Sequence, residues 1–216
     1  LDPDRDQSYV LYAMTQDQLA HTRFPLGELT KPQVRQIARA QGFLNAGKPD
    51  SQDICFVPDG DYPAFIRRYT GKDYPPGAFV DLQGKPLGRH RGVIHYTIGQ
   101  RRGLGVSAEH PLYVQAIDPE TNTVTLTEQD GLYTRTLLAR DLNWIAVPGL
   151  DKPTRCRAKI RYRQSEQPAT AVLLDKTTLE LRFDTPQRAV TPGQAVVLYQ
   201  GEVVLGGGTI QQAKQA

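Results

Sequence analysis

The chain has 216 residues, of which 39% are hydrophobic and 23% are charged, which is an ordinary composition for a folded protein long enough to contain more than one core. The formal net charge of +3 is too small to indicate a partner by itself, and no apolar run approaches the roughly 18 residues of a membrane span. The two cysteines, Cys55 and Cys156, cannot form a disulfide framework, and we expect both to be reduced at rest.

The first sixty residues are predicted to be helical. The segments Thr15–Gln18 and Thr30–Gln33 each fit the capping box with which a helix begins. Asp61 is a candidate cap for a further helix, which Gly71 would end. We therefore expect residues 1–60 to form a short helical connector that leads into the next unit.

Cys55 lies in the charged and polar run of residues 48–56. A buried structural thiol normally has apolar neighbours, so this setting favours a thiol that reaches water. The nearby Asp50 and Asp53 would raise the pKa of the thiol, however, and a lone cysteine is commonly a small buried residue. The residues alone leave both a reactive nucleophile and a core cysteine open.

From Pro75 onward, proline and glycine separate short runs of β-branched residues, which is typical of strands joined by tight turns. Residues 113–127 and 171–183 each predict a hairpin. Successive strands without long helices favour a closed antiparallel barrel, which leaves no exposed edge. The predicted fold is α+β and mainly β, with a small β-rich central domain over residues 61–136 and a C-terminal antiparallel β-barrel over residues 137–216.

Alternating basic residues form the clearest pattern that can be read without knowledge of any family. Side chains two residues apart on a strand point to the same face about 6.6 Å apart, so these bases would form one charged face. Like charges without an acid between them repel each other unless an anion compensates, which favours contacts to RNA phosphates over an ordinary solvated strand face. The five bases are Arg155, Arg157, Lys159, Arg161 and Arg163.

A second basic segment, Gly99–Gly105, contains Arg101 and Arg102 but lacks the Lys-Ser/Thr ending of a P-loop. We interpret it as turn geometry with phosphate contacts from the two arginines, and not as a nucleotide site. His90 and His95 have no cysteine pair or carboxylate at ligand spacing, so we expect polar surface or RNA-facing residues and no metal site.

Longer motifs follow one another through most of the chain. They are Arg5–Tyr9, Pro49–Phe56, Tyr96–Gly105, Arg161–Gln164, Val190–Gln194 and Leu205–Gly208. In this order they resemble the motifs of the tRNA-specific 2-thiouridylases, the MnmA family. Pro49–Phe56 is similar to the family's second-cysteine motif, and Arg161–Gln164 is similar to its RNA-contacting strand.

The resemblance implies that Cys55 is catalytic and carries a persulfide sulfur to the wobble uridine of a tRNA, whose C2 oxygen is first adenylated with ATP. It implies the tRNA anticodon arm and a persulfide sulfur-donor protein as partners, in the cytoplasm. It also implies tRNA contacts by Arg5, which replaces the family's lysine, and by Asp6, Gln7, Arg161, Tyr162 and Gln194. Strict alternation would point Arg161 and Tyr162 apart, so we expect the strand to bulge or to end near them.

The family's ATP-pyrophosphatase domain, with its phosphate loop and first catalytic cysteine, is not found in this sequence. We therefore expect the chain to be the C-terminal portion of a longer enzyme in which the N-terminal domain binds ATP. This portion would need no cofactor of its own and would be inactive alone. The alternative is a stand-alone, non-catalytic module that binds tRNA or another RNA, with Cys55 as a remnant.

Overall fold

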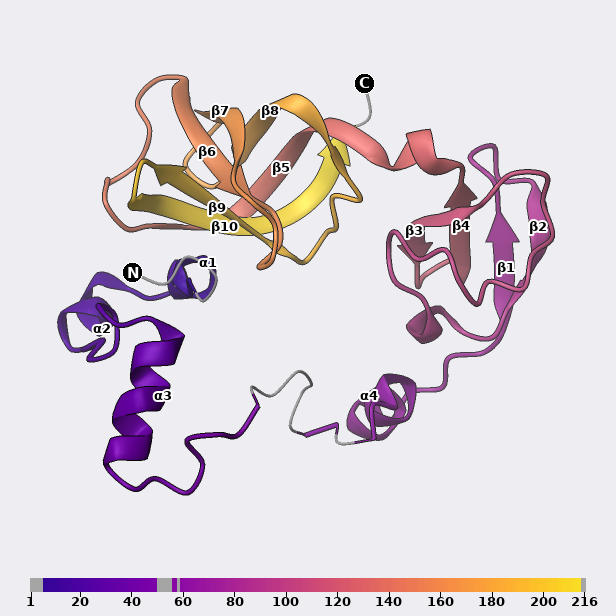
Figure 1. Cartoon of the computed structure of the whole chain (residues 1–216). Coiled ribbons are helices and arrows are strands. Elements are labelled where there is room, and N and C mark those ends of the chain that lie inside the picture. The colour runs from indigo at the N-terminus through magenta and orange to yellow at the C-terminus, as the bar shows by residue number, and fades with distance from the viewer. Residues whose placement is uncertain (1–5, 50–55, 58, 215–216) are drawn as a thin grey trace. The chain divides into compact units, whose positions relative to one another are not determined.

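The computed structural model describes residues 6–49, 56–57 and 59–214, which fall into two compact units. The first unit comprises Leu1–Asp50, Arg135–Thr185 and Pro192–Ala216, and the second comprises Ser51–Thr134 and Pro186–Thr191. The fold is mainly β with a few short helices, so the predicted α+β class is confirmed (Figure 1). The predicted division at residues 60 and 136 remains a prediction. In the described part of the chain, no helix is long and apolar enough to cross a membrane.

Three of the helices begin where the local sequence indicates. Thr15 begins the second helix with a complete capping box, and the Gln33 side chain accepts a hydrogen bond from the backbone N–H of Thr30 at 2.8 Å. The Asp61 side chain accepts from the backbone N–H of Ala64 at 3.0 Å, and Gly71 ends that helix in the left-handed conformation. The helices are α1 (Ser8–Leu11), α2 (Gln16–Ala20), α3 (Lys31–Ala40) and α4 (Tyr62–Thr70).

The second unit contains a four-stranded sheet in the order β2-β1-β4-β3. Its strands are β1 (Gly77–Val80), β2 (Pro86–His90), β3 (Tyr113–Asp118) and β4 (Thr123–Thr127), and two short 3-10 helices, η2 (Val93–His95) and η3 (Gln129–Leu132), accompany them. β3 and β4 form the predicted antiparallel hairpin, whereas β1 pairs with β4 in parallel. The buried core of this unit consists of Phe79, Val93, Tyr96, Leu104, Val114, Val124 and Leu126.

His90 corrects one expectation, because its side chain is buried in this sheet and is not on the surface. Its ring packs edge-on against Phe79 and Tyr96, Nε2 lies 3.1 Å from the carbonyl oxygen of Asn122, and Nδ1 accepts from the N–H of Gly92 at 3.1 Å. Burial lowers the pKa of His90, in opposition to the Asn122 hydrogen bond. A neutral ring whose two nitrogens are both hydrogen-bonded explains how His90 can be buried in the core of this unit. His95, by contrast, is only partly buried and lies beside Arg67.

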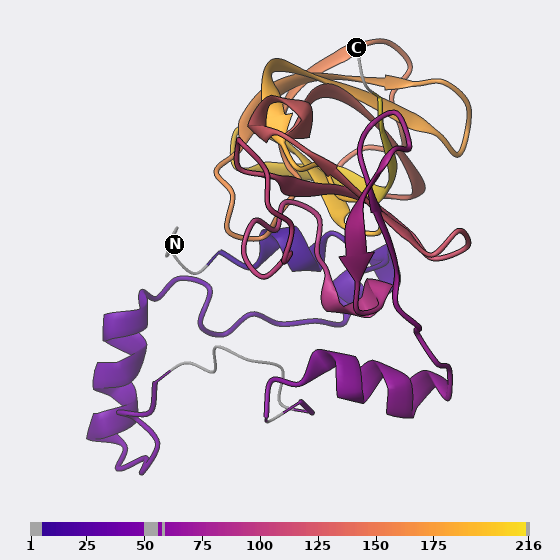
Figure 2. The ribbon, with the colours of Figure 1, turned by 90° about the vertical axis from the view of Figure 1, so that its right-hand side faces the viewer.

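The first unit is built around a closed six-stranded barrel in the order β10-β5-β8-β7-β6-β9, so the predicted barrel is confirmed. Figures 1 and 2 show these strands curving around a common interior. β7 and β8 form the second predicted hairpin. The barrel strands are β5 (Tyr133–Trp144), β6 (Thr154–Lys159), β7 (Gln167–Leu173), β8 (Leu179–Arg188), β9 (Ala195–Gln200) and β10 (Val203–Lys214).

Gly207 on β10 allows the N-terminal segment to approach the barrel closely. A Cβ atom at this position would lie 2.5 Å from the carbonyl oxygen of Val196 and 2.6 Å from the ring of Tyr12. Figure 1 shows α1 beside β9 and β10, where Tyr9, Val197 and Tyr199 form a small buried cluster. The missing side chain at Gly207 is therefore what leaves room for the Tyr12 ring against the barrel.

We predict that Gly207→Ala destabilises the chain by about 1–3 kcal/mol, because the added methyl group meets backbone on one side and an aromatic ring on the other. The matched control is Gly47→Ala, since an added Cβ at Gly47 meets no atom within 4 Å. Urea unfolding of both variants measures the difference. Equal stability of the two variants would contradict the close packing at Gly207.

Candidate nucleic-acid interface

The segment that carries the first motif is held against the barrel by hydrogen bonds to distant strands. The side-chain amide of Asn143 on β5 donates to the carbonyl oxygens of Tyr12 and Met14 at 2.6 and 2.9 Å. The hydroxyl of Tyr9, a buried residue, donates to the carbonyl oxygen of Ala195 at 2.8 Å. Burial is the largest cause that raises the pKa of Tyr9 to about 12, so this hydroxyl remains a donor at neutral pH.

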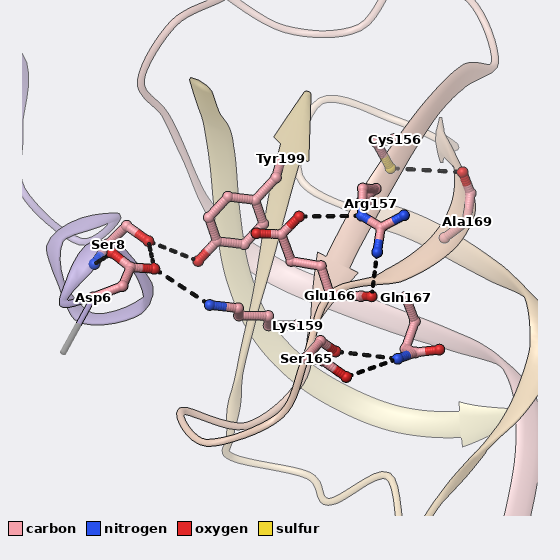
Figure 3. Close-up of polar contacts among 10 residues, drawn as sticks. All are labelled: Asp6, Ser8, Cys156, Arg157, Lys159, Ser165, Glu166, Gln167, Ala169 and Tyr199. Carbon is pink, nitrogen blue, oxygen red and sulfur yellow. Dashed lines mark hydrogen bonds and ion pairs between the residues drawn. The ribbon is translucent and has the colours of Figure 1, made fainter. Parts of the chain in front are cut away.

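Asp6 lies at the centre of a second set of contacts (Figure 3). Its carboxylate accepts from the backbone N–H and the hydroxyl of Ser8 at 2.8 and 2.6 Å, and it pairs with Lys159 Nζ at 3.3 Å. The Lys159 ammonium lies 5.3 Å from the ring centroid of Tyr199, and the Tyr199 hydroxyl is 3.2 Å from the Ser8 hydroxyl. The four side chains therefore form one polar junction between the N-terminal segment and the barrel strands β6 and β9.

Tyr162 lies beside this junction, in the turn that follows β6. Its hydroxyl accepts from the Gln7 side-chain amide at 2.6 Å, and its ring packs edge-on against Tyr9 with centroids 6.3 Å apart. The side chain is still 40% exposed, so part of the ring faces water. Gln164 closes the turn, since its side chain accepts from the N–H of Ile160 at 3.2 Å and its own N–H donates to the carbonyl oxygen of Arg161 at 3.2 Å.

Five residues with predicted tRNA contacts thus lie in the same unit, and four of them are brought together although about 150 residues separate them in sequence. Asp6 and Gln7 approach the turn that holds Arg161 and Tyr162, and Arg161 is close enough for its charge to act on the pKa of Tyr9. Gln194 is exposed and immediately precedes Ala195, the acceptor of the Tyr9 hydroxyl. The sixth residue, Arg5, and the predicted catalytic residue, Cys55, lie outside the described residues.

The basic strand differs from its sequence-based prediction in length and in charge. β6 ends at Lys159, before Arg161 and Tyr162. This agrees with the expectation that the strand would bulge or end near these two residues, since strict alternation would point them apart. Cys156, Ala158 and Ile160 are buried as expected, but the face predicted to carry all five bases continues only to Lys159. Arg161 and Arg163 belong to the following turn and not to the strand.

Each of the three bases of β6 pairs with a carboxylate that lies outside the strand. Arg155 makes a bidentate ion pair with Asp184 at 2.8 and 2.7 Å. Figure 3 shows the next pair, in which Arg157 Nε lies 3.2 Å from a Glu166 carboxylate oxygen. Lys159 is paired with Asp6, as described above. The repulsion between the bases, which favoured contacts to RNA phosphates in the sequence-based prediction, is therefore compensated by carboxylates of the same unit. The spacing of the bases alone could not indicate these partners.

The remaining candidates are not among the residues of this junction. Arg101 and Arg102 are exposed in the second unit, in a turn where the Gln100 side chain donates to the carbonyl oxygen of Arg102 at 2.9 Å. Burial raises the pKa of the Cys156 thiol to about 11, which makes this cysteine a poor nucleophile at neutral pH. Over residues 6–49, 56–57 and 59–214, no group of three or more histidine, cysteine, aspartate or glutamate side chains could hold a metal ion.

Sequence reasoning missed the residues that hold the junction together. Ser8 and Tyr9 are part of the Arg5–Tyr9 motif but were not recognised as structural contacts, and Tyr199 and Asn143 lie outside every motif. The only available signal was the placement of Ser8 and Tyr9 inside a long motif. The partners on β5 and β9 are determined by the fold and have no local signature.

Three family models match successive parts of the chain. Residues 1–59 match a tRNA methyl transferase HUP domain, residues 63–128 a tRNA methyl transferase PRC-barrel domain, and residues 134–210 an aminomethyltransferase beta-barrel domain. The chain thus contains, in order, three domains that are described by models of tRNA-modifying enzymes.

The relatives define the family more closely. The tRNA-specific 2-thiouridylase MnmA of Acetivibrio thermocellus is 52% identical over 207 residues, which are 96% of this chain and 58% of the relative. The proteins of the same name from Lachnoclostridium phytofermentans and Desulfitobacterium hafniense are 52% and 51% identical over 95% of the chain. The chain is homologous to the tRNA-specific 2-thiouridylases over nearly its whole length, and it spans about 58% of the length of these relatives.

We predict that Lys159→Met destabilises the chain by roughly 1–2 kcal/mol, because the Lys159 side chain is only 13% exposed and its loss leaves Asp6 without its cation. Arg157→Met is the matched control, since the Arg157 side chain is 52% exposed, and it should cost less than about 1 kcal/mol. Urea unfolding near neutral pH compares the two variants. A Lys159→Met cost no larger than that of the control would show that the Asp6 contact contributes little.

The same variant has a predictable pH dependence. Partial burial raises the pKa of Asp6, but hydrogen bonds from Ser8 and Lys159 and the charge of Lys159 outweigh this and bring it below the usual 3.8. A carboxyl group with a lowered folded pKa stabilises the fold above its unfolded pKa and loses this contribution as the pH falls through the folded pKa. The stability difference between wild type and Lys159→Met should therefore narrow as the pH falls below 3.8.

Proposed function

We propose that this chain is the tRNA-binding part of a tRNA-uridine 2-sulfurtransferase that thiolates the wobble uridine. The observation that carries the proposal is the convergence of Asp6, Gln7, Arg161 and Tyr162 at one end of the barrel, in a chain about 52% identical to named 2-thiouridylases. The word methyltransferase occurs only in the names of the domain models. The named relatives, which match nearly the whole chain, favour sulfur transfer.

In this proposal, different residues at and beside the junction make different kinds of contact with the anticodon arm. The exposed part of the Tyr162 ring can stack on an unpaired base, since every base has an apolar face. Arg161, in the same turn, supplies a guanidinium for a backbone phosphate, and the exposed amides of Gln7 and Gln194 can bond to base edges or ribose. A surface of this kind suits a loop whose bases are unstacked.

Asp6 is not proposed to contact the RNA directly, because its negative charge would repel a phosphate. Its carboxylate accepts two hydrogen bonds from Ser8 and pairs with Lys159. These contacts fix the backbone immediately before Gln7 and leave the amide of Gln7 directed at Tyr162. Asp6 therefore acts by positioning Gln7, and the contact to the RNA is made by its neighbours.

The chemical step is proposed for Cys55. The C2 oxygen of the uridine is activated by adenylation with ATP, and a sulfur carried by Cys55 as a persulfide replaces it with release of AMP. A second cysteine then attacks the Sγ atom of Cys55, which breaks the bond between Cys55 and the transferred sulfur and frees the 2-thiouridine. The disulfide left between the two cysteines must be reduced before the next turnover. A persulfide-bearing protein supplies the sulfur, a domain of the longer enzyme binds the ATP, and the reaction belongs in the cytoplasm. On this account the chain alone binds tRNA but does not thiolate it.

The proposal predicts different defects for two variants of the full-length enzyme. Cys55→Ser should keep wild-type affinity for tRNA and form less than a few per cent of the wild-type 2-thiouridine. Tyr162→Ala should weaken tRNA binding by about 1–3 kcal/mol, because one stacking partner is lost. Nucleoside mass spectrometry measures the product, and filter binding measures the affinity.

Two outcomes would overturn parts of the proposal. Thiolation by Cys55→Ser at a substantial rate would remove Cys55 as the sulfur carrier. Unchanged affinity in Tyr162→Ala would remove the turn after β6 from the tRNA-binding surface. If the full-length protein binds tRNA but neither variant nor wild type forms 2-thiouridine, the chain is a non-catalytic RNA-binding module.

A further inference from the structure

A second basic site lies on the outer face of the barrel, across four neighbouring strands. The register places Arg155 of β6 beside Thr170 of β7, and Thr170 beside Arg182 of β8, so that these residues form a row. β5, on the other side of β8, contributes Arg135. An open pocket of about 410 Å³ is lined by Arg135, Thr170, Arg182, Phe183 and Asp184.

Strand alternation explains why the polar ends of this row face water. Arg182 lies between Leu181 and Phe183, which are 0% and 2% exposed and fill the barrel interior. Thr170 lies in the same way between two buried alanines, Ala169 and Ala171. The pocket is therefore fixed on rigid strands whose opposite sides form the core.

The charges in this pocket do not balance. Asp184 is the one carboxylate among the lining residues, and the bidentate pair with Arg155 engages both of its oxygens. Arg135 Nη1 donates to the backbone carbonyl oxygen of Asp184 at 2.5 Å, which positions the guanidinium without neutralising it. The side chain of Arg182 makes no hydrogen bond or ion pair within the part of the chain that the structure describes. Three guanidinium groups thus face one carboxylate.

Nearby acids do not supply the missing charge. Glu180, on the same strand as Arg182, pairs with Lys214, and Glu166, before β7, pairs with Arg157. The hydrogen bond from Arg155 lowers the pKa of Asp184, followed by the charges of Arg155 and Arg135, so this carboxylate stays ionised and keeps Arg155 occupied. The pocket carries about two uncompensated positive charges on planar groups that suit the oxygens of a phosphate.

We propose that Arg135 and Arg182 bind a backbone phosphate of the tRNA, with Asp184 and Arg155 forming the fixed wall of the site. The inference rests on the proposed function, because tRNA supplies the phosphate. Arg155 precedes Lys159 by four residues on β6, a distance of about 13 Å along the strand. The RNA backbone would thus run along the outside of β6, from the Tyr162 turn toward this pocket. This contact positions the RNA and does not read its sequence.

The test uses the whole chain of 216 residues and an unmodified tRNA transcript with uridine at the wobble position, in filter binding over a salt series. Arg182→Ala and Arg135→Ala should each weaken binding roughly 3- to 30-fold and reduce the slope of log affinity against log salt by about 0.7–0.9. Arg182→Lys keeps the charge but not the planar fork, so it should keep the slope and lose part of the affinity. The matched control is Arg140→Ala, an exposed arginine on β5 outside the pocket, which should leave the slope unchanged.

The outcomes separate this inference from the proposed function. If Tyr162→Ala weakens binding while Arg182→Ala and Arg135→Ala bind like wild type, the phosphate site is wrong and the proposed function stands. Equal slope losses in Arg140→Ala and Arg182→Ala would reduce the effect to general charge, and would also overturn the site. If the wild-type chain does not bind the transcript at all, the proposed tRNA function fails together with the site. Circular dichroism of each variant distinguishes a lost contact from a lost fold.

Discussion

The candidate site depends on the docking of residues 6–16 against the barrel. Asn143 fixes the backbone at Tyr12 and Met14, Tyr9 is buried with its hydroxyl on Ala195, and the Gln16 side chain donates to the carbonyl oxygen of Ile145 at 2.8 Å. These bonds join segments that are 129 to 186 residues apart in sequence. Closing such a long loop costs conformational entropy, but this cost rises only slowly with length, so a few buried contacts can offset it.

Charge compensation determines which basic residues remain available to a ligand. On β6 each base has a carboxylate partner, and the two exposed pairs, those of Arg155 and Arg157, add little stability. Their effect is to hold side chains in place. Lys159 is used to anchor the N-terminal segment, whereas the pair of Arg155 with Asp184 leaves Arg135 and Arg182 with excess positive charge. A basic surface is thus better judged by its unpaired arginines than by the number of its bases.

The parts of the fold with a local cause could be predicted from the sequence. Capping by Thr15 and Asp61, the hairpins around residues 118–123 and 173–179, and the closed barrel all follow from signals within a few residues or from the exclusion of exposed strand edges. A bulge or an end of the strand near Arg161 and Tyr162 was expected for a different reason, because the resemblance implies RNA contacts by both residues and a regular strand would point them apart. β6 ends at Lys159, just before them.

The parts that depend on distant partners could not be predicted. The pairing of Asp6 with Lys159 and of Asp184 with Arg155 joins residues 153 and 29 positions apart. The buried ring of His90 likewise has a distant partner, the carbonyl oxygen of Asn122. The family motifs identified Gln7, Arg161 and Tyr162 individually. Only the fold brings Gln7 to the Tyr162 hydroxyl.

Hydrogen exchange of the chain with and without tRNA tests the central claim most directly, namely that the docked N-terminal segment and the turn after β6 form one RNA-binding surface. The account predicts that amides in residues 7–12 and in residues 160–164 gain protection together when tRNA is added, because both sides of the junction become less accessible and less mobile. Binding of tRNA with unchanged exchange in both segments, and protection only elsewhere in the chain, would contradict it.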